Sequence, residues 1–125
     1  MSIDIKKIIE EKNISTIEVI YADTLGTLGG KMVPTKSFLK NYENGFGVCK
    51  ASLGWDIQGQ ILDGFDISDF KSGCPDVFIK PILTTLKEIP WRKGNAFVLG
   101  EIHEENGDEF QFAPRYILKK LVNKF

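Results

Sequence analysis

The first fifteen residues repeat their apolar positions with the period of a helix. The apolar side chains that share one helical face are Ile5, Ile8 and Ile9, and Lys and Glu side chains occupy the opposite face. Ser2 or Asp4 can cap the start of such a helix, and Asn13 can end it. We therefore expect an N-terminal helix within residues 1–15.

A period of two begins at residue 16, where alternate positions carry Ile17, Val19 and Tyr21. Strict alternation with β-branched residues predicts a strand over residues 16–23. The stretch "TLGTLGG" then supplies glycines for a tight turn, and "KMVP" is typical of a partner strand that ends at Pro34. Thr35 can cap a short helix that Gly45 closes.

The second half alternates between short apolar strands and turn residues. Strands are predicted for "FGVCKAS", "DVFIKPIL" and "NAFVLGEI", and Asn106-Gly107 predicts a hairpin that returns into "EFQF". "TTLKEIPW" is typical of a turn or of a single helical turn. Pro114 can begin a last helix, whose apolar side is formed by Tyr116, Leu118, Leu121 and Val122. Strands and helices in this order predict an α+β fold with a mixed sheet.

Composition limits the classes of function. The chain has 125 residues, 42% hydrophobic and 26% charged, which is the size and balance of one globular domain. The formal net charge of -1 predicts no binding to nucleic acid or to a membrane surface. The two cysteines, Cys49 and Cys74, are too few for a disulfide framework or a zinc site, so we expect reduced thiols and a cytoplasmic protein.

Residues 54–73 form a long loop without helical or strand periodicity. Loops of this length are often functional in compact domains. The loop carries four aspartates that could bind a divalent cation: Asp56, Asp63, Asp66 and Asp69. Their spacing is not that of a calcium-binding loop, which favours turn residues instead. Asp56 differs from the others because it follows Trp55, an aromatic residue that could anchor the loop on the core.

No other residue forms an active site by itself. His103 is surrounded by Glu101, Glu104 and Glu105, but neighbours on a strand alternate between faces and do not converge on one metal ion. Ser52 has no histidine nearby in the sequence. By themselves, the residues therefore indicate a globular α+β domain. One hypothesis for its function is a stand-alone module that binds a protein partner through an exposed sheet edge.

Three stretches together resemble the N-terminal domain of the glutamine synthetase family. They are "IEVIYADTLGTLGGKMVPTKSFL", "PDVFIKPILTTLKEIPW" and "NAFVLGEIHEENGDEFQFAPRYILKKL". The resemblance implies a β-grasp (ubiquitin-like) fold over residues 16–113 after an N-terminal helix in residues 1–15. It also implies that residues 114–125 begin a helix leading to a C-terminal catalytic domain that these 125 residues do not contain.

The resemblance implies a reaction for the whole enzyme. Members of this family use ATP to activate the side chain of glutamate, and ammonia or an amine then forms the amide. ATP and Mg²⁺ or Mn²⁺ would be held by the catalytic domain, with no cofactor or metal in this chain, which we expect to be inactive alone. The partners would be the catalytic domains of its own and adjacent subunits in a homo-oligomeric ring.

The resemblance also implies a site residue. In the family a loop aspartate helps to bind and deprotonate ammonium in the neighbouring subunit, and Asp56 is our assignment for it. Ser52, Gly54 and Trp55 would frame the same substrate loop. In an alternative alignment the family's aspartate falls near Lys50, and the carboxylate has been lost.

The sequence departs from the common bacterial glutamine synthetases at several positions. Ile82 follows Pro81 where the family usually has aspartate, and Ala113 stands before Pro114-Arg115 in place of aspartate. The Pro90-Trp91 pair resembles the ending of the same segment in the branch of the family that contains γ-glutamyl-amine ligases. A γ-glutamyl-amine or polyamine ligase is therefore the alternative to a glutamate–ammonia ligase.

Overall fold

Residues 3–67 and 70–125, which are the residues that this computed structural model describes, form one six-stranded sheet and three α-helices. The α-helices and strands are α1 (Ile5–Glu11), β1 (Thr16–Ala22), β2 (Leu28–Pro34), α2 (Thr35–Asn41), β3 (Phe46–Cys49), β4 (Asp76–Pro81), β5 (Lys87–Glu88), β6 (Asn95–His103) and α3 (Pro114–Lys124). Three short 3₁₀ segments cover Lys50–Gly54, Phe70–Ser72 and Leu83–Thr85.

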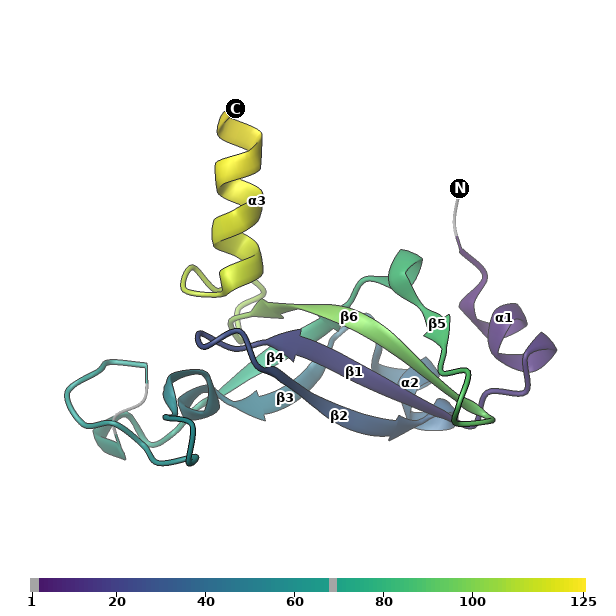
Figure 1. Cartoon of the computed structure of the whole chain (residues 1–125), viewed down its shortest axis with the longest axis horizontal. Helices are drawn as coiled ribbons and strands as arrows, with labels where there is room; N and C mark the ends of the chain where they lie inside the picture. Colours follow the sequence, from purple (N-terminus) through teal and green to yellow (C-terminus); the bar gives the residue numbers. More distant parts are fainter. Residues whose placement is uncertain (1–2, 68–69) are drawn as a thin grey trace.

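The sheet has the strand order β2-β1-β6-β4-β3, with β5 paired to the side of β6. The central pair, β1 and β6, is parallel and brings Thr16 opposite Asn95. All other pairs are antiparallel. Figure 1 shows the sheet as a twisted layer, with α2 on one side and the long loop after β3 at one end. This mixed sheet confirms the predicted α+β fold of the β-grasp type.

One face of the sheet forms the core. The alternation predicted for β1 is observed, since Ile17, Val19 and Tyr21 are buried. Phe38 of α2 is fully buried over this face, and its ring stacks on Phe46 with 5.6 Å between centroids. Burial of large apolar side chains such as these contributes most of the folding free energy.

The helix starts differ in part from the predictions. Asp4 caps α1, because its carboxylate accepts a hydrogen bond of 3.1 Å from the Lys7 amide. Ser2, the other candidate, lies outside the described residues. Thr35 does not cap α2 as predicted: Pro34 occupies the cap position and no side chain bonds there. Proline fixes the extended backbone that precedes the helix, so the strand can lead directly into it.

Two strand predictions were wrong in their extent. The stretch "EFQF" is not a strand, because only Glu109 forms a bridge, to His103. Phe110 instead inserts into the core and its amide donates to the Ile102 carbonyl oxygen, which turns the chain toward α3. Conversely, β2 begins at Leu28, earlier than the predicted "KMVP", because its glycines lie in the strand and not in the turn. Gly29, for example, leaves room for the ring of Tyr21.

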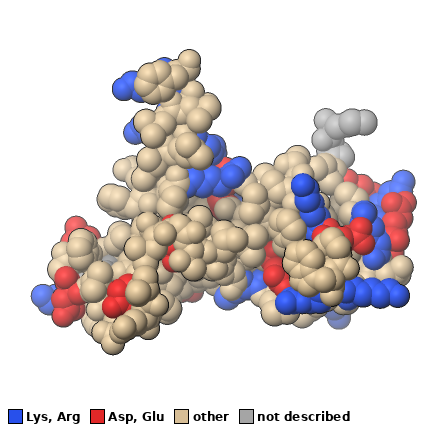
Figure 2. Space-filling view, viewed as in Figure 1, with Lys and Arg blue, Asp and Glu red and all other residues tan. Residues whose placement is uncertain are grey.

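The last helix, α3, rises from the sheet and packs little against it (Figure 1). None of its residues is buried. The predicted apolar side exists, but Leu118, Leu121 and Val122 are each more than half exposed, at 61%, 51% and 65%. The space-filling view in Figure 2 shows uncharged surface over much of this helix and the sheet below it.

Candidate functional site

The predicted site residues lie together in the segment that follows β3. Lys50–Gly54 forms a 3₁₀ turn, and the chain then reverses so that Trp55 forms a bridge with Ile61. Asp56 stands at the start of this reversal. Its Oδ1 accepts hydrogen bonds from the amides of Gln58 at 2.8 Å and Gln60 at 2.9 Å. The Asp56 carboxylate therefore shapes the loop, as aspartates do in turns.

Ser52 and Leu53, just before Gly54, hold the base of this loop against the β1–β2 hairpin. The Ser52 hydroxyl donates to the Cys49 carbonyl oxygen at 2.7 Å and lies 3.3 Å from the Tyr21 hydroxyl. Next to Gly54, the Leu53 carbonyl oxygen accepts a bond of 2.6 Å from Thr24. Leu53 itself is buried. The base of the loop is thus fixed to the sheet, while its tip is exposed.

A largely apolar cavity opens beside Asp56. Its volume is about 440 Å³, and the side chains that line it come from the hairpin tip and the loop: Thr24, Leu25, Trp55, Asp56, Ile57, Leu62, Phe65 and Ile67, with Gly54. Trp55 is 39% exposed and Ile57 90% exposed, so the rim faces outward. Among the described residues that line it, Asp56 is the one with a charged side chain. The cavity can accept an apolar group with a carboxylate at its edge.

The other metal-ligand candidates do not assemble. Within residues 3–67 and 70–125, no group of three or more His, Cys, Asp or Glu side chains could hold a metal ion. Asp69 lies outside the described residues. His103 is engaged locally, because its Nδ1 lies 3.0 Å from the Gly107 carbonyl oxygen. Among the described residues, the candidates predicted from the sequence therefore do not form a metal site with three such ligands.

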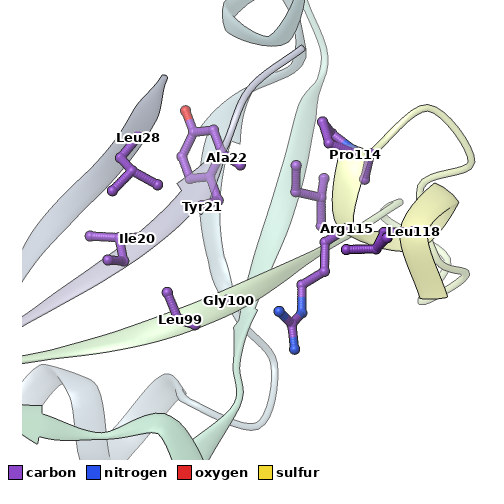
Figure 3. A pocket seen from close by; sticks show the side chains of 11 residues that line it. Ile20, Tyr21, Ala22, Leu28, Leu99, Gly100, Pro114, Arg115 and Leu118 are labelled. Carbon is purple, nitrogen blue, oxygen red and sulfur yellow. The ribbon is translucent and has the colours of Figure 1, made fainter. Parts of the chain in front are cut away.

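A second apolar groove lies between α3 and the outer face of the sheet. Figure 3 shows Ile20 and Leu28 on one side, Leu99 below, and Leu118 and Arg115 on the helix. Its volume is about 270 Å³. Half of this groove could be predicted, since the apolar side of the last helix is evident in the sequence. The sheet residues opposite it could not be known before the strand order was.

Charged side chains beside this groove link α3 to β6. Glu101 accepts from Lys119 at 3.0 Å and lies 3.5 Å from Arg115, and Lys119 also bonds Glu109 at 2.8 Å. Burial raises the pKa of Glu101, but the hydrogen bond and charge of Lys119, together with Arg115, outweigh it and leave this pKa below its ordinary value. The hydrogen bonds to Glu109 and Glu101 raise the pKa of Lys119.

None of the described helices is long and apolar enough to cross a membrane.

Comparison with known proteins identifies relatives of this chain. No protein-family model matches it. It is 34% identical to glutamate–isopropylamine ligase from Pseudomonas sp over 121 residues, which are 96% of this chain and 26% of that protein. It is 29% identical to type-1 glutamine synthetase 2 from Dictyostelium discoideum, over 86% of this chain and 21% of that protein.

A solved structure of GmaS in complex with ADP has the same fold, with a TM-score of 0.76 and 24% identity over 97% of this chain and 25% of that one. The chain therefore spans about a quarter of the length of the proteins that it matches.

Proposed function

Because this chain belongs to the glutamine synthetase family, to whose N-terminal region it corresponds, we propose that it serves an ATP-dependent ligase that forms an amide at the side chain of glutamate. Its role in that enzyme is to complete the active site of a neighbouring subunit. The observation that carries this proposal is the Asp56 loop, which is fixed at its base and presents one carboxylate beside an outward-facing cavity.

Asp56 binds the nitrogen donor in this proposal. A carboxylate attracts ammonium or an alkylammonium ion and can accept the proton that must leave before the nitrogen attacks. The turn uses Oδ1 of Asp56, and among residues 3–67 and 70–125 the hydrogen bonds of this carboxylate are to that oxygen. Oδ2 is then the atom that would face the cation. Ser52, Gly54 and Trp55 act by holding and framing the loop.

ATP and its divalent metal would bind elsewhere in the enzyme, where they supply the activated γ-glutamyl group. The described residues of this chain contain no cluster that could hold the metal, so no step of the phosphoryl transfer is assigned to them. We accordingly expect the isolated chain to show no ATP turnover. Turnover comparable to that of a complete ligase by the isolated chain would contradict the proposal.

The nitrogen donor is either ammonia or a larger amine. Ammonia carries no apolar group, whereas the cavity beside Asp56 is lined mainly by apolar side chains. The relative with 34% identity is a glutamate–isopropylamine ligase. Both observations support a small alkylamine as a second candidate for the nitrogen donor, beside ammonia.

The test uses the Asp56→Asn variant in the complete ligase that contains this chain. Asparagine retains an Oδ1 acceptor for the turn but removes the charge. We expect kcat/KM for the nitrogen donor to fall by about 10²-fold, with little change in the KM for ATP. Asp63→Asn, which removes an exposed charge from the same loop, is the control and should remain within about twofold of the wild type.

The same assay distinguishes the nitrogen donors. If an alkylamine is the donor, kcat/KM for isopropylamine should exceed that for ammonia, and Trp55→Ala should reduce the first more than the second. If Asp56→Asn leaves both values unchanged, the proposal is wrong. A stand-alone interaction module would then be favoured.

A further inference from the structure

The two cysteines of the chain stand at the two ends of the loop that carries the candidate site. Cys49 is the last residue of β3, and Cys74 lies just before β4. Residue 49 is the direct partner of Asp76 across the β3–β4 pair. Cys74 precedes that pair by two residues, so it lies next to the end of the ladder where Cys49 stands.

The Cys49 side chain lies close to the backbone of Cys74. The Cys49 sulfur lies 3.9 Å from the carbonyl oxygen of Cys74. The backbones next to them are joined, because the Lys50 amide donates to the Pro75 carbonyl oxygen at 2.8 Å. Both thiols are free and only partly buried, so a small reagent can reach them.

The two positions differ in how firmly they are held. Cys49 is part of the β ladder, and the next residue, Lys50, is fixed by Glu104 at 2.9 Å and by the face of the Phe110 ring. Cys74 lies outside the ladder in a left-handed conformation, with φ of 50°, which is uncommon for a residue with a side chain. Because Cys74 lies outside the ladder, a change in its conformation need not disturb the sheet.

We propose that Cys49 and Cys74 form a redox modification site that reacts with small-molecule disulfides such as oxidised glutathione. One cysteine thiolate attacks the glutathione disulfide, forms a mixed disulfide and releases one glutathione thiolate. The second cysteine thiolate then attacks the protein sulfur of that mixed disulfide and releases the second glutathione. The protein loses two protons and two electrons, and one glutathione disulfide becomes two thiols.

The bond would tie together the ends of residues 50–73. This segment contains Ser52, Trp55 and Asp56, so the oxidised form would restrict the loop that we assign to the neighbouring active site. The chemistry of the thiol pair does not depend on that assignment. The consequence for activity rests on the proposed function.

The test equilibrates the 125-residue chain with defined ratios of reduced and oxidised glutathione, followed by acid quenching and mass spectrometry. We expect a main product about 2 Da lighter than the reduced chain, with both sulfurs blocked to iodoacetamide. The same measurement in 6 M guanidinium chloride gives the effective concentration of one thiol relative to the other in the unfolded chain. The folded chain should exceed that value at least tenfold, because the β3–β4 pair already holds the ends together.

Cys49→Ser and Cys74→Ser are the matched controls, and each should stop at one glutathione adduct. The proposal is overturned if the folded wild type accumulates two glutathione adducts without losing 2 Da. An effective concentration no higher than in guanidinium would also overturn it. Neither result depends on ligase activity. The proposed function is tested separately, by the Asp56→Asn variant.

Discussion

Asp23 and Asp56 perform the same structural task in two different loops. Each carboxylate accepts hydrogen bonds from the amides two and four residues later, and each loop has a glycine with positive φ at the fourth position. The pattern Asp-x-x-Gly-x occurs at both places in the sequence. A carboxylate that shapes a turn through one oxygen leaves its other oxygen available. Asp56 can therefore hold the turn and also bind the nitrogen donor, as in the proposed function.

The turn at Asp56 can be tested without any enzyme assay. Asp56→Ala removes both acceptor bonds, and we expect the amides of Gln58 and Gln60 to exchange hydrogen faster, by the equivalent of about 1 kcal/mol each. Asp56→Asn should leave these amides close to the wild type, because its Oδ1 can accept the same bonds. Equal protection in all three proteins would show that the carboxylate does not hold the turn.

Gly100 in β6 is required for close packing against β4. A Cβ added at this position would overlap the Cγ2 methyl of Ile79, which is buried. Gly100→Ala should therefore lower the free energy of unfolding by about 1–3 kcal/mol, measured by urea denaturation. Adding Ile79→Leu removes that methyl and should recover part of the loss. No recovery would mean that another contact causes the loss.

At the scale of elements, α3 is held by charge more than by burial. The ion pairs of Glu101 with Arg115 and Lys119 cross from β6 to a helix that has no buried residue. The pKa of Glu101 is lower in the folded chain than its ordinary value of 4.5. A lowered carboxylate pKa stabilises the folded form above that ordinary value, and the stabilisation is lost as the pH falls through the lower folded value.

Glu101→Gln tests this attachment. At pH 7 we expect the variant to be less stable than the wild type by about 0.5–1 kcal/mol, a value typical of partly exposed ion pairs. The difference should decrease as the pH falls below the ordinary pKa of 4.5 and should disappear once Glu101 is protonated in the folded state as well. It should also shrink in 1 M salt. A difference that is independent of both pH and salt would point to packing in place of charge.

The sequence predicted the helices and most strands, and it failed where distant residues decide the structure. The alternation of apolar and polar residues in β1 reflects the burial of one face of that strand. The strand could therefore be predicted from its own residues. The strand β5 was not predicted, because its two residues are extended only through pairing with β6. The site shows the same limit: the sequence indicated Asp56 and Trp55, but the contribution of Leu25 to the same cavity depends on how the hairpin tip meets the loop.

At the scale of the whole molecule, the exposed apolar side chains include two groups that border the cavities described above. One is the side of α3, and the other is the rim of the cavity beside Asp56. Figure 2 shows charged residues gathered mainly around α1 and at the end of the loop, with a further basic group beside α3. Exposed apolar regions of this kind mark interaction sites, in agreement with a domain that packs against others.

Leu121→Glu and Leu53→Ala separate exposed from buried leucines. Leu121 is 51% exposed, so its replacement should change the free energy of unfolding by less than about 0.5 kcal/mol and should reduce self-association measured by sedimentation. Leu53 is 1% exposed, and its truncation should cost about 2–5 kcal/mol. A large loss of stability in Leu121→Glu would mean that this side of α3 contributes to the folded chain.

The parallel pairing of β1 with β6 has a consequence for the speed of folding. Thr16 meets Asn95, so the two central strands are separated by most of the chain. Contacts of such high contact order form only after a long loop has closed, and they slow the folding of small domains. Until β6 arrives, the hairpin of β1 and β2 has an unpaired central edge. We therefore expect this fold to form in milliseconds to seconds, more slowly than a helical bundle of equal length.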